Sequence, residues 1–289
     1  MPNVRAKPTL RRRRLGGALK GFRSAAGLTL EAAAAAMGWD SGKLSRIENA
    51  KAQIWPKEIA PLLGVYGVED TGAVNALEEL ARNAGKQGWW QTYGDVIGGV
   101  YQDYMFLESD AAGIRVYCPG VIHGLLQTSG YAREVIAATA ITRSPDEVAA
   151  LVEVRQARQS VLTRPGNPLK MWAVIHEAAL RQQFPARSDV MPAQLQRLLD
   201  LSEMTHIDIQ VMPLEASPHP GLAGPFDVVS FGGPWPTVVN LENLRGGFFI
   251  EGDDVSVFEA AFDRTVAAAL PVDVSRETIK TIMKEGKHS

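Results

Sequence analysis

Two basic side chains, Lys43 and Arg46, stand close together in a segment whose apolar members are Leu44 and Ile47. Residues three or four positions apart share one face of a helix, so a helix here has basic and apolar residues on different faces. An α-helix with basic residues near its start and an apolar inner face is the kind that lies in the major groove of DNA. The guanidinium of Arg46 suits this role, because it can donate two hydrogen bonds to one guanine edge. The segment therefore predicts the chemistry of DNA recognition.

Residues that could catalyse a reaction or bind a metal form no complete set in the sequence. His176-Glu177 begins like a zinc-hydrolase motif, but Leu180 stands where a second histidine is needed to bind the metal. Three other histidines have no Cys, His or Asp at metal-ligand spacing; they are His123, His206 and His219. A nucleophile elbow and a phosphate-binding loop are also absent from the sequence. We predict that the protein is not an enzyme and has no catalytic residues, metal site or cofactor.

The elements that must position Lys43 and Arg46 follow from residues 28–49, which have the layout of a helix-turn-helix. Thr29 is predicted to cap the first short helix, and Gly38-Trp39 supplies the turn. Asp40 or Ser41 caps the second helix, because a short oxygen side chain accepts the free amide hydrogens at a helix start. The predicted buried face of the first helix consists of Leu28, Ala32, Ala36 and Met37.

Three further helices complete a predicted five-helix bundle within residues 1–85. They span about residues 12–26, 56–66 and 71–86, with Gly27 in a left-handed turn and Pro56 at a first helical position. The run Arg11 to Arg14 precedes the motif. Two interpretations of this run are open, a solvated charge run and a phosphate-contacting arm or helix start, and its position favours the second.

The remaining residues predict a linker and a second domain. Residues 86–100 hold aromatic and glycine-rich stretches typical of a linker, and residues 101–289 alternate between strand and helix patterns. The strands at 207–212, 226–231 and 238–241 are too closely spaced for helical crossovers, so that part of the sheet is predicted to be antiparallel. The predicted fold is an all-α N-terminal helix-turn-helix bundle plus an α+β C-terminal domain with a partly antiparallel sheet. The other expected strands are 115–117 and 171–175, and the expected helices are 101–113, 128–139, 145–163, 189–203, 254–269 and 273–285.

Charge is divided unevenly along the 289 residues. Residues 1–60 hold 12 Lys and Arg against 4 Asp and Glu, a net charge of +8, whereas residues 61–289 hold 18 against 28, a net charge of −10. A basic module on an acidic body indicates a polyanionic partner for the module alone. The single cysteine, Cys118, suits a reducing compartment. No apolar run reaches the length of a membrane span, and no export signal is evident, so we expect a cytoplasmic protein with no membrane partner.

Residues 15–66 resemble the Xre/Cro/C1 family of repressor-like DNA-binding domains. The matching motifs are Leu28-Thr29-Leu30-Glu31, Met37-Gly38-Trp39 and Leu44-Ser45-Arg46-Ile47-Glu48-Asn49. The resemblance implies that Arg23 and Glu48 form a buried ion pair between the first and third helices. Leu30 stands where the family usually has glutamine. Ala50 stands where a glycine usually follows the helix, so Asn49 or Ala50 must take the left-handed conformation, which is easier for asparagine. The DNA-binding residues expected from the motif and the resemblance together are Arg12, Arg14, Thr29, Ser41, Gly42, Lys43, Ser45 and Arg46.

The rest of the chain resembles the C-terminal domain of the actinobacterial Scr-type antitoxin-like transcriptional regulators. The matching segments are Gly88-Trp89-Trp90, Pro119 to Thr128 with Tyr131-Ala132, Glu153 to Gln159, and His219 to Phe226. Several such relatives are similar to antitoxins that act with a small partner protein, which makes such a partner possible here.

The sequence as a whole predicts a sequence-specific DNA-binding transcriptional regulator. Its expected partners are double-stranded DNA and a second copy of the chain, because one recognition helix contacts only a few base pairs. Two alternatives stay open: the antitoxin of a toxin–antitoxin pair that binds a small protein, and a small-molecule-responsive regulator.

Overall fold

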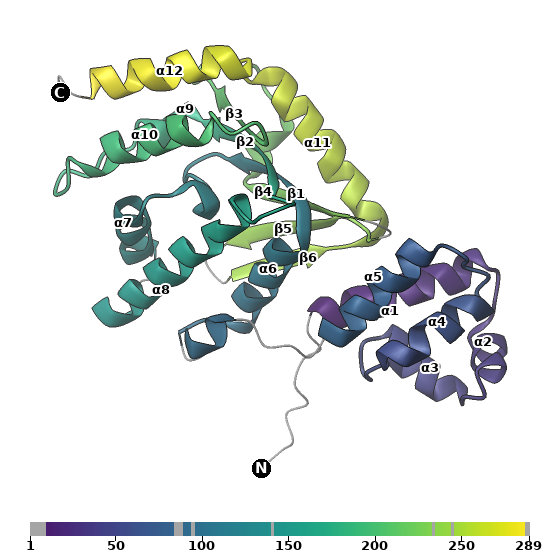
Figure 1. The fold of residues 1–289 in the computed structure, drawn as a ribbon. Coiled ribbons are helices and arrows are strands. Elements are labelled where there is room, and N and C mark those ends of the chain that lie inside the picture. The colour runs from purple at the N-terminus through teal and green to yellow at the C-terminus, as the bar shows by residue number, and fades with distance from the viewer. Residues whose placement is uncertain are drawn as a thin grey trace. The chain divides into compact units, whose positions relative to one another are not determined.

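The computed structural model describes residues 10–83, 89–93, 96–139, 142–232, 235–243 and 246–286. The chain divides into two compact units (Figure 1). The first, which we call the helical unit, comprises residues 1–91 and the short segment Gly232–Pro236. The second, the sheet unit, comprises residues 92–231 and 237–289. A short 3₁₀ helix, η1 (Trp89–Tyr93), spans the boundary between the two ranges within the predicted linker.

The helical unit contains the five predicted helices. They are α1 (Leu10–Ala25), α2 (Leu30–Ala36), α3 (Ser41–Glu48), α4 (Pro56–Val65) and α5 (Thr71–Asn83). Their core is made by apolar residues that all five helices contribute, among them Leu19, Leu44 and Leu77, which are fully buried. The end predicted for the fifth helix, at residue 86, lies outside the described residues.

The helix ends follow the predicted chemistry. The side chain of Thr29 accepts a hydrogen bond from the amide of Ala32 at 3.1 Å and caps α2. Asp40, rather than Ser41, caps α3, because its Oδ1 accepts from the Lys43 amide at 2.8 Å. Gly27 and Gly38 have φ of +67° and +66°, the left-handed conformation that suits glycine in a turn.

One sequence prediction about this unit is wrong in detail. Ala32 and Ala36 are exposed, and Ala33 and Ala34 are buried instead. A run of five alanines offers no change of side chain to fix which face turns inward, so its phase could not be predicted from the sequence. Of the two residues expected to take the left-handed conformation after α3, Ala50 does so, with φ of +57°, while the Asn49 side chain donates to the Ser45 carbonyl at 2.8 Å.

The sheet unit is built on six strands in the order β3-β2-β1-β4-β5-β6. They are β1 (Ala111–Cys118), β2 (Lys170–His176), β3 (Ile207–Met212), β4 (Phe226–Phe231), β5 (Val238–Asn243) and β6 (Gly246–Ile250). The strands β3, β2 and β1 are parallel, and the remaining pairs are antiparallel. The α+β class with a partly antiparallel sheet is therefore confirmed.

Two strand predictions need correction. Residues 207–212 form a strand, but it pairs in parallel with β2 at one edge and does not belong to the antiparallel part. The strand β6 was not predicted, because it begins with Gly246-Gly247 and glycine has weak strand propensity.

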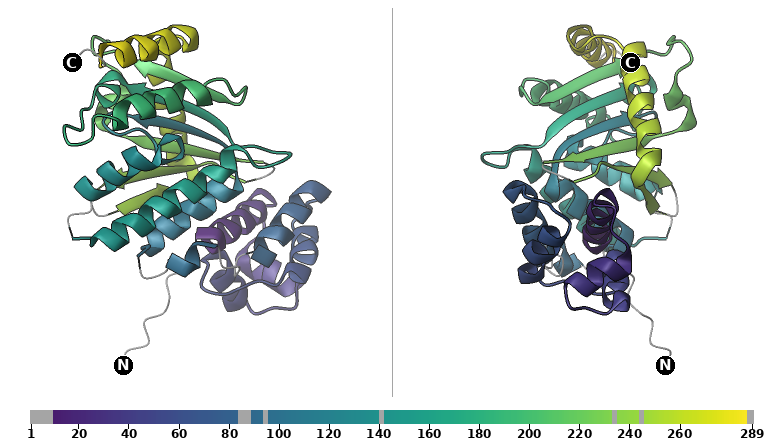
Figure 2. Two further views of the ribbon diagram at one scale, coloured as in Figure 1. Left: turned by 60° about the vertical axis from the view of Figure 1, so that its left-hand side comes forward. Right: turned by 90° about the vertical axis from the view of Figure 1, so that its right-hand side faces the viewer.

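Helices cover both faces of the sheet (Figures 1 and 2). On one face, Phe262 of α11 (Val255–Ala268) packs among Tyr117 and Phe226. The helices α6 (Gly99–Asp110) and α8 (Pro145–Arg158) lie on the other face. Successive residues of a strand point to opposite faces, so Asp227 points away from Phe226, and it hydrogen-bonds to Tyr104 of α6. The remaining helices are α7 (Ser129–Thr139), α9 (Glu177–Leu180), α10 (Val190–Leu201) and α12 (Val272–Glu285), and the short 3₁₀ turns are η2 (Gly124–Leu126), η3 (Gln159–Leu162), η4 (Pro220–Ala223) and η5 (Gly252–Asp254).

Candidate nucleic-acid interface

The outward face of α3 is a narrow stripe defined by helical spacing. Leu44, Ile47 and Glu48 are buried, so the opposite side of the helix is left to solvent. This stripe consists of Gly42, Ser45, Arg46 and Asn49. Ser41 is half-buried at the helix start. Of the predicted DNA-binding residues, the structure thus places Gly42, Ser45 and Arg46 together on one surface.

Arg46 is the cation on this stripe. Its side chain is exposed, and among the described residues it has no ion-pair or hydrogen-bond partner. A Cβ built on Gly42 would lie 3.1 Å from its NH1, so the guanidinium lies against Gly42, one turn towards the helix start. Residues at the start of a recognition helix are those that contact base edges, and the guanidinium reaches this end of α3.

Lys43 does not share this surface in the way the sequence predicted. Its Nζ lies 2.8 Å from Glu58 Oε1 of α4 and 3.7 Å from the centre of the Trp39 ring. Burial alone would raise the pKa of Glu58, but hydrogen bonds from Lys43 and from the Trp55 amide outweigh it and lower the pKa below its ordinary value. The pair therefore joins α3 to the start of α4, and the ammonium group is not presented alongside Arg46.

The predicted phosphate contacts on α1 differ from each other. The basic run Arg11 to Arg14 lies within the first turns of α1, so it forms a helix start and not an arm. Arg12 is partly exposed, whereas Arg14 is only 3% exposed, with its guanidinium carbon 5.4 Å from the centre of the Trp235 ring. Arg14 is thus wrong as a surface contact, because its helical phase turns it inward. Thr29 is exposed at the start of α2.

The ion pair between Arg23 and Glu48 is present and holds α3 in place. Arg23 Nε and NH2 donate to the two carboxylate oxygens at 2.7 and 2.9 Å, and NH1 donates to the Leu28 carbonyl at 2.8 Å. One guanidinium thus links α1, the turn before α2, and the end of α3. The hydrogen bond to Glu48 raises the pKa of Arg23 above its ordinary value.

A position that the sequence analysis missed, Gly16, sets the approach of α1 to α3. A Cβ at this residue would lie 2.5 Å from the Glu48 carbonyl oxygen and 2.7 Å from that of Ile47. Only glycine lets the two backbones come this close. The available signal was a glycine inside a helix, which costs about 1 kcal/mol relative to alanine and so needs a packing reason.

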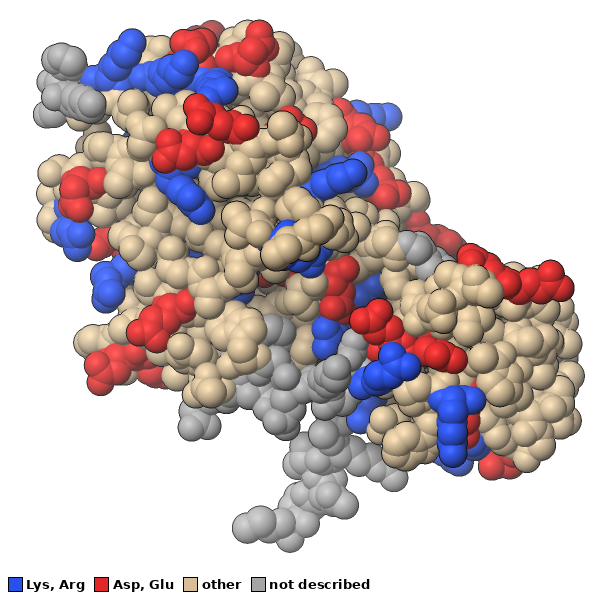
Figure 3. Space-filling model, viewed as in Figure 1, with Lys and Arg blue, Asp and Glu red and all other residues tan. Residues whose placement is uncertain are grey.

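Charge on the helical unit is not spread evenly. In the view of Figure 3, a row of acidic side chains lines the upper edge of this unit, and basic side chains lie lower on the same face among further acidic ones. Lys51, which follows α3, and Lys57, in the first turn of α4, are exposed. Cations near a recognition helix suit the phosphates that flank a groove.

The sheet unit contains a buried polar network where distant segments of the chain meet. Glu108 of α6 and Arg158 of α8 form an ion pair whose side chains are 1% and 5% exposed. The same guanidinium donates to the Tyr101 hydroxyl. Nearby, Gln127 accepts from Arg155 at 3.0 Å and donates to the Ile122 carbonyl at 2.6 Å. Two segments that carry the family resemblance, 119–128 and 153–159, are thus joined by a hydrogen bond.

His123 ends a chain of hydrogen bonds within this network. Its Nδ1 accepts from the Leu125 amide, which leaves Nε2 to donate to the Tyr104 hydroxyl at 2.9 Å. The hydroxyl in turn donates to Asp227 at 2.8 Å, and Asn240 donates to the same carboxylate oxygen at 2.9 Å. Burial lowers the pKa of His123 to about 4 and raises the pKa of Asp227. The histidine is neutral at pH 7, and its ring joins η2 to α6.

Ligand-binding features are few in the parts of the chain that the structure describes. Within them, no group of three or more His, Cys, Asp or Glu is placed to hold a metal ion. Among their helices, none has both the length and the apolar character of a membrane span. One surface hollow lies in the sheet unit, between Pro218–Pro220 and α11.

Comparison with known families agrees with this division of the chain. Residues 14–77 match a helix-turn-helix domain, so the first unit is of a class that binds DNA. Residues 101–281 match the family described as a domain of unknown function, DUF5753, and because this match covers more than half of the 289 residues, the protein belongs to that family. No curated protein and no solved structure matches the chain.

Proposed function

We propose that the protein is a sequence-specific DNA-binding regulator of transcription that acts in the cytoplasm as a dimer, and that it is not an enzyme. The observation that supports this proposal best is Arg46. It is an exposed arginine on the outer stripe of α3, and its guanidinium lies against Gly42, one turn earlier. The helix is held by the Asp40 cap and the Arg23–Glu48 pair. A rigid helix with one accessible guanidinium can donate two hydrogen bonds to guanine O6 and N7.

The proposed dimer rests on the size of the recognition element. The helix α3 has 8 residues, and one such helix contacts only a few base pairs. Two copies held at a fixed spacing would contact a symmetric operator. The sheet unit is the part of the chain available to hold them, because it holds 16 Lys and Arg against 24 Asp and Glu, a net charge of −8, and has no electrostatic attraction for DNA. The finer assignment, an Xre-type member of the antitoxin-like group with a small partner protein, rests on the sequence resemblance alone.

Selection of binding sites from random duplexes, with the full chain, tests the proposal. We expect enrichment of a short two-fold symmetric motif and a dimer on DNA by light scattering. Arg46→Ala should then lose about 1–3 kcal/mol of discrimination between the selected site and random DNA. Arg82→Ala is the matched control, because Arg82 is an exposed arginine at the end of α5. Failure to enrich any motif, or equal losses for the two variants, would contradict the proposal.

A further inference from the structure

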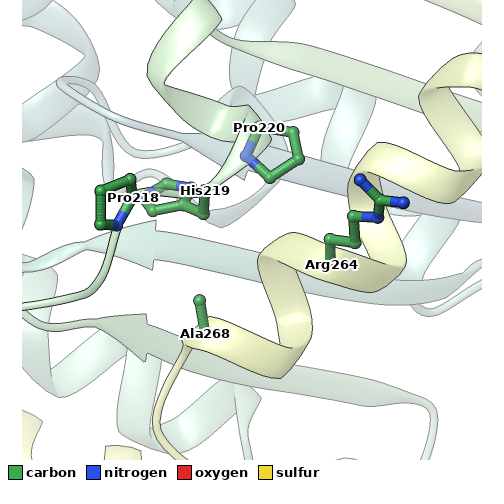
Figure 4. Close-up of a pocket in the computed structure, with 5 residues that line it drawn as sticks. All are labelled: Pro218, His219, Pro220, Arg264 and Ala268. Carbon is green, nitrogen blue, oxygen red and sulfur yellow. The ribbon is translucent and has the colours of Figure 1, made fainter.

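The hollow in the sheet unit has the size of a small-molecule site. Its volume is about 370 Å³, and it is lined by Pro218, His219, Pro220, Arg264 and Ala268. Pockets for small ligands are typically of about 300–1,000 Å³ and mainly apolar, with a few polar groups that fix orientation. Figure 4 shows Pro218, His219 and Pro220 on the loop at one side, and Arg264 and Ala268 projecting from α11 at the other.

The loop side of the hollow is preformed by packing. The ring of His219 stands edge-on to Tyr117, with centroids 5.5 Å apart. A Cβ on Gly221 would lie 2.5 Å from the Tyr117 ring and 2.8 Å from His219 Nδ1, so glycine is needed for the turn to close here. Prolines on both sides of His219 restrict the backbone further. A wall fixed before binding loses little entropy when a ligand arrives.

The helix side supplies one cation. The acidic residues of α11 near Arg264 are engaged elsewhere, since Glu259 and Asp263 lie 3.1 and 3.5 Å from Arg115. In the described parts of the chain, exposed Arg264 has no ion-pair or hydrogen-bond partner. Its guanidinium therefore retains its planar set of donors, which matches the two oxygens of a carboxylate.

The other polar group is a neutral one. Desolvation, and to a smaller extent the charge of His176, lowers the pKa of His219, so the ring adds no second positive charge at pH 7. A single cation between proline and alanine walls suits a monoanion with an apolar body, whereas a phosphate dianion usually needs several donors. The hollow also lies beside Tyr117, one residue before the end of β1.

We propose that this hollow binds a small carboxylate with a flat apolar body, held at its carboxylate by Arg264 and packed against Pro218, Pro220 and Ala268. The full chain should bind benzoate, the probe that represents this class, in calorimetric titration and with a dose-dependent rise in Tm. Benzamide, its neutral isostere, should bind about tenfold more weakly or worse, because it lacks the charge-assisted pair.

Two matched variants locate the site. Arg264→Gln should weaken benzoate binding about tenfold or more, whereas Arg133→Gln should bind benzoate like the wild type. Arg133 is likewise an exposed arginine on a helix of the sheet unit, α7. Absence of benzoate binding, equal binding by Arg264→Gln, or binding of inorganic phosphate in place of benzoate would overturn the proposal. The probe is measured without DNA, so this inference and the proposed function can fail separately.

Discussion

At the scale of single residues, the surface of α3 depends on the absence of a side chain at Gly42. A Cβ there would lie 2.8 Å from Asp40 Oδ1 and 3.1 Å from Arg46 NH1, so Gly42→Ala must displace one or both. We expect unfolding to change little, because alanine gains about 1 kcal/mol of helix propensity and a weakened cap loses about the same. Affinity for the selected operator should fall by about tenfold, since the Arg46 guanidinium moves away from the start of the helix.

The control for this prediction is Gly17→Ala. Gly17 is an exposed glycine of α1, and a Cβ there would meet no atom within 4 Å. Its operator affinity should equal that of the wild type, and its stability should rise slightly. Thermal unfolding and a fluorescence binding titration measure the two effects. Unchanged affinity of Gly42→Ala would show that the placement of Arg46 over Gly42 does not matter for DNA.

A second residue-scale prediction concerns His123 and acid. Its pKa is about 4 in the folded protein and 6.5 ordinarily, so the unfolded chain takes up the proton first as the pH falls. The free energy of unfolding should therefore decrease between about pH 6.5 and 4, by up to about 3 kcal/mol from this group. The raised pKa of Asp227 acts in the opposite sense, and the other charged groups that act on His123 are Glu108, Arg155 and Arg158.

His123→Gln separates these contributions, because glutamine keeps an amide donor and does not titrate. The variant should be less stable at pH 7 and should lose less stability than the wild type between pH 6.5 and 4. Urea unfolding at a series of pH values gives both curves. Parallel curves for wild type and variant would rule out His123 as the titrating group.

At the scale of elements, α3 depends on the clamp that joins it to α1. The Glu48 side chain is 2% exposed and that of Arg23 is 12% exposed, so Glu48→Ala leaves a guanidinium largely buried without its carboxylate. Breaking such a pair costs about 3–5 kcal/mol when it is well buried. We expect the helical unit to unfold at a clearly lower temperature while the sheet unit unfolds as before, in a calorimetric scan of the full chain. A single unchanged transition would contradict this prediction.

Element boundaries were largely predictable from the sequence, and pairings between distant segments were not. The caps at Thr29 and Asp40 and the turns at Gly27 and Gly38 depend on neighbours a few residues away, so local patterns identify them. The partner of Lys43 is Glu58, on another helix. A local pattern places the lysine on a helix face but does not reveal what engages it there.

The same limit applies to the sheet unit. Its strands were mostly predicted, but the place of β3 at the edge is set by hydrogen bonds to β2 across a long intervening chain. The segments 119–128 and 153–159 belong to the family resemblance, but no local pattern in them explains their residue types. In the structure Arg155, Gln127 and their neighbours bond to one another, which supplies a structural reason. The hollow beside His219 needs α11, which the loop sequence does not indicate.

At the scale of the whole molecule, attraction for DNA should come from one end of the chain. Residues 1–60 have a net charge of +8 and residues 61–289 a net charge of −10. Phosphate contacts release counterions, so the logarithm of the binding constant should fall linearly with the logarithm of salt concentration, with a slope of about −0.9 per phosphate contact.

Lys51, exposed directly after α3, is the test residue for such a contact. Lys51→Ala should weaken operator and random DNA by the same factor and make the slope shallower by about one, whereas Arg46→Ala should change the preference between the two DNAs. Titrations at four salt concentrations with both DNAs separate the two roles. If Lys51→Ala altered the preference and left the slope unchanged, the division of α3 and its flank into base-contacting and phosphate-contacting residues would be wrong.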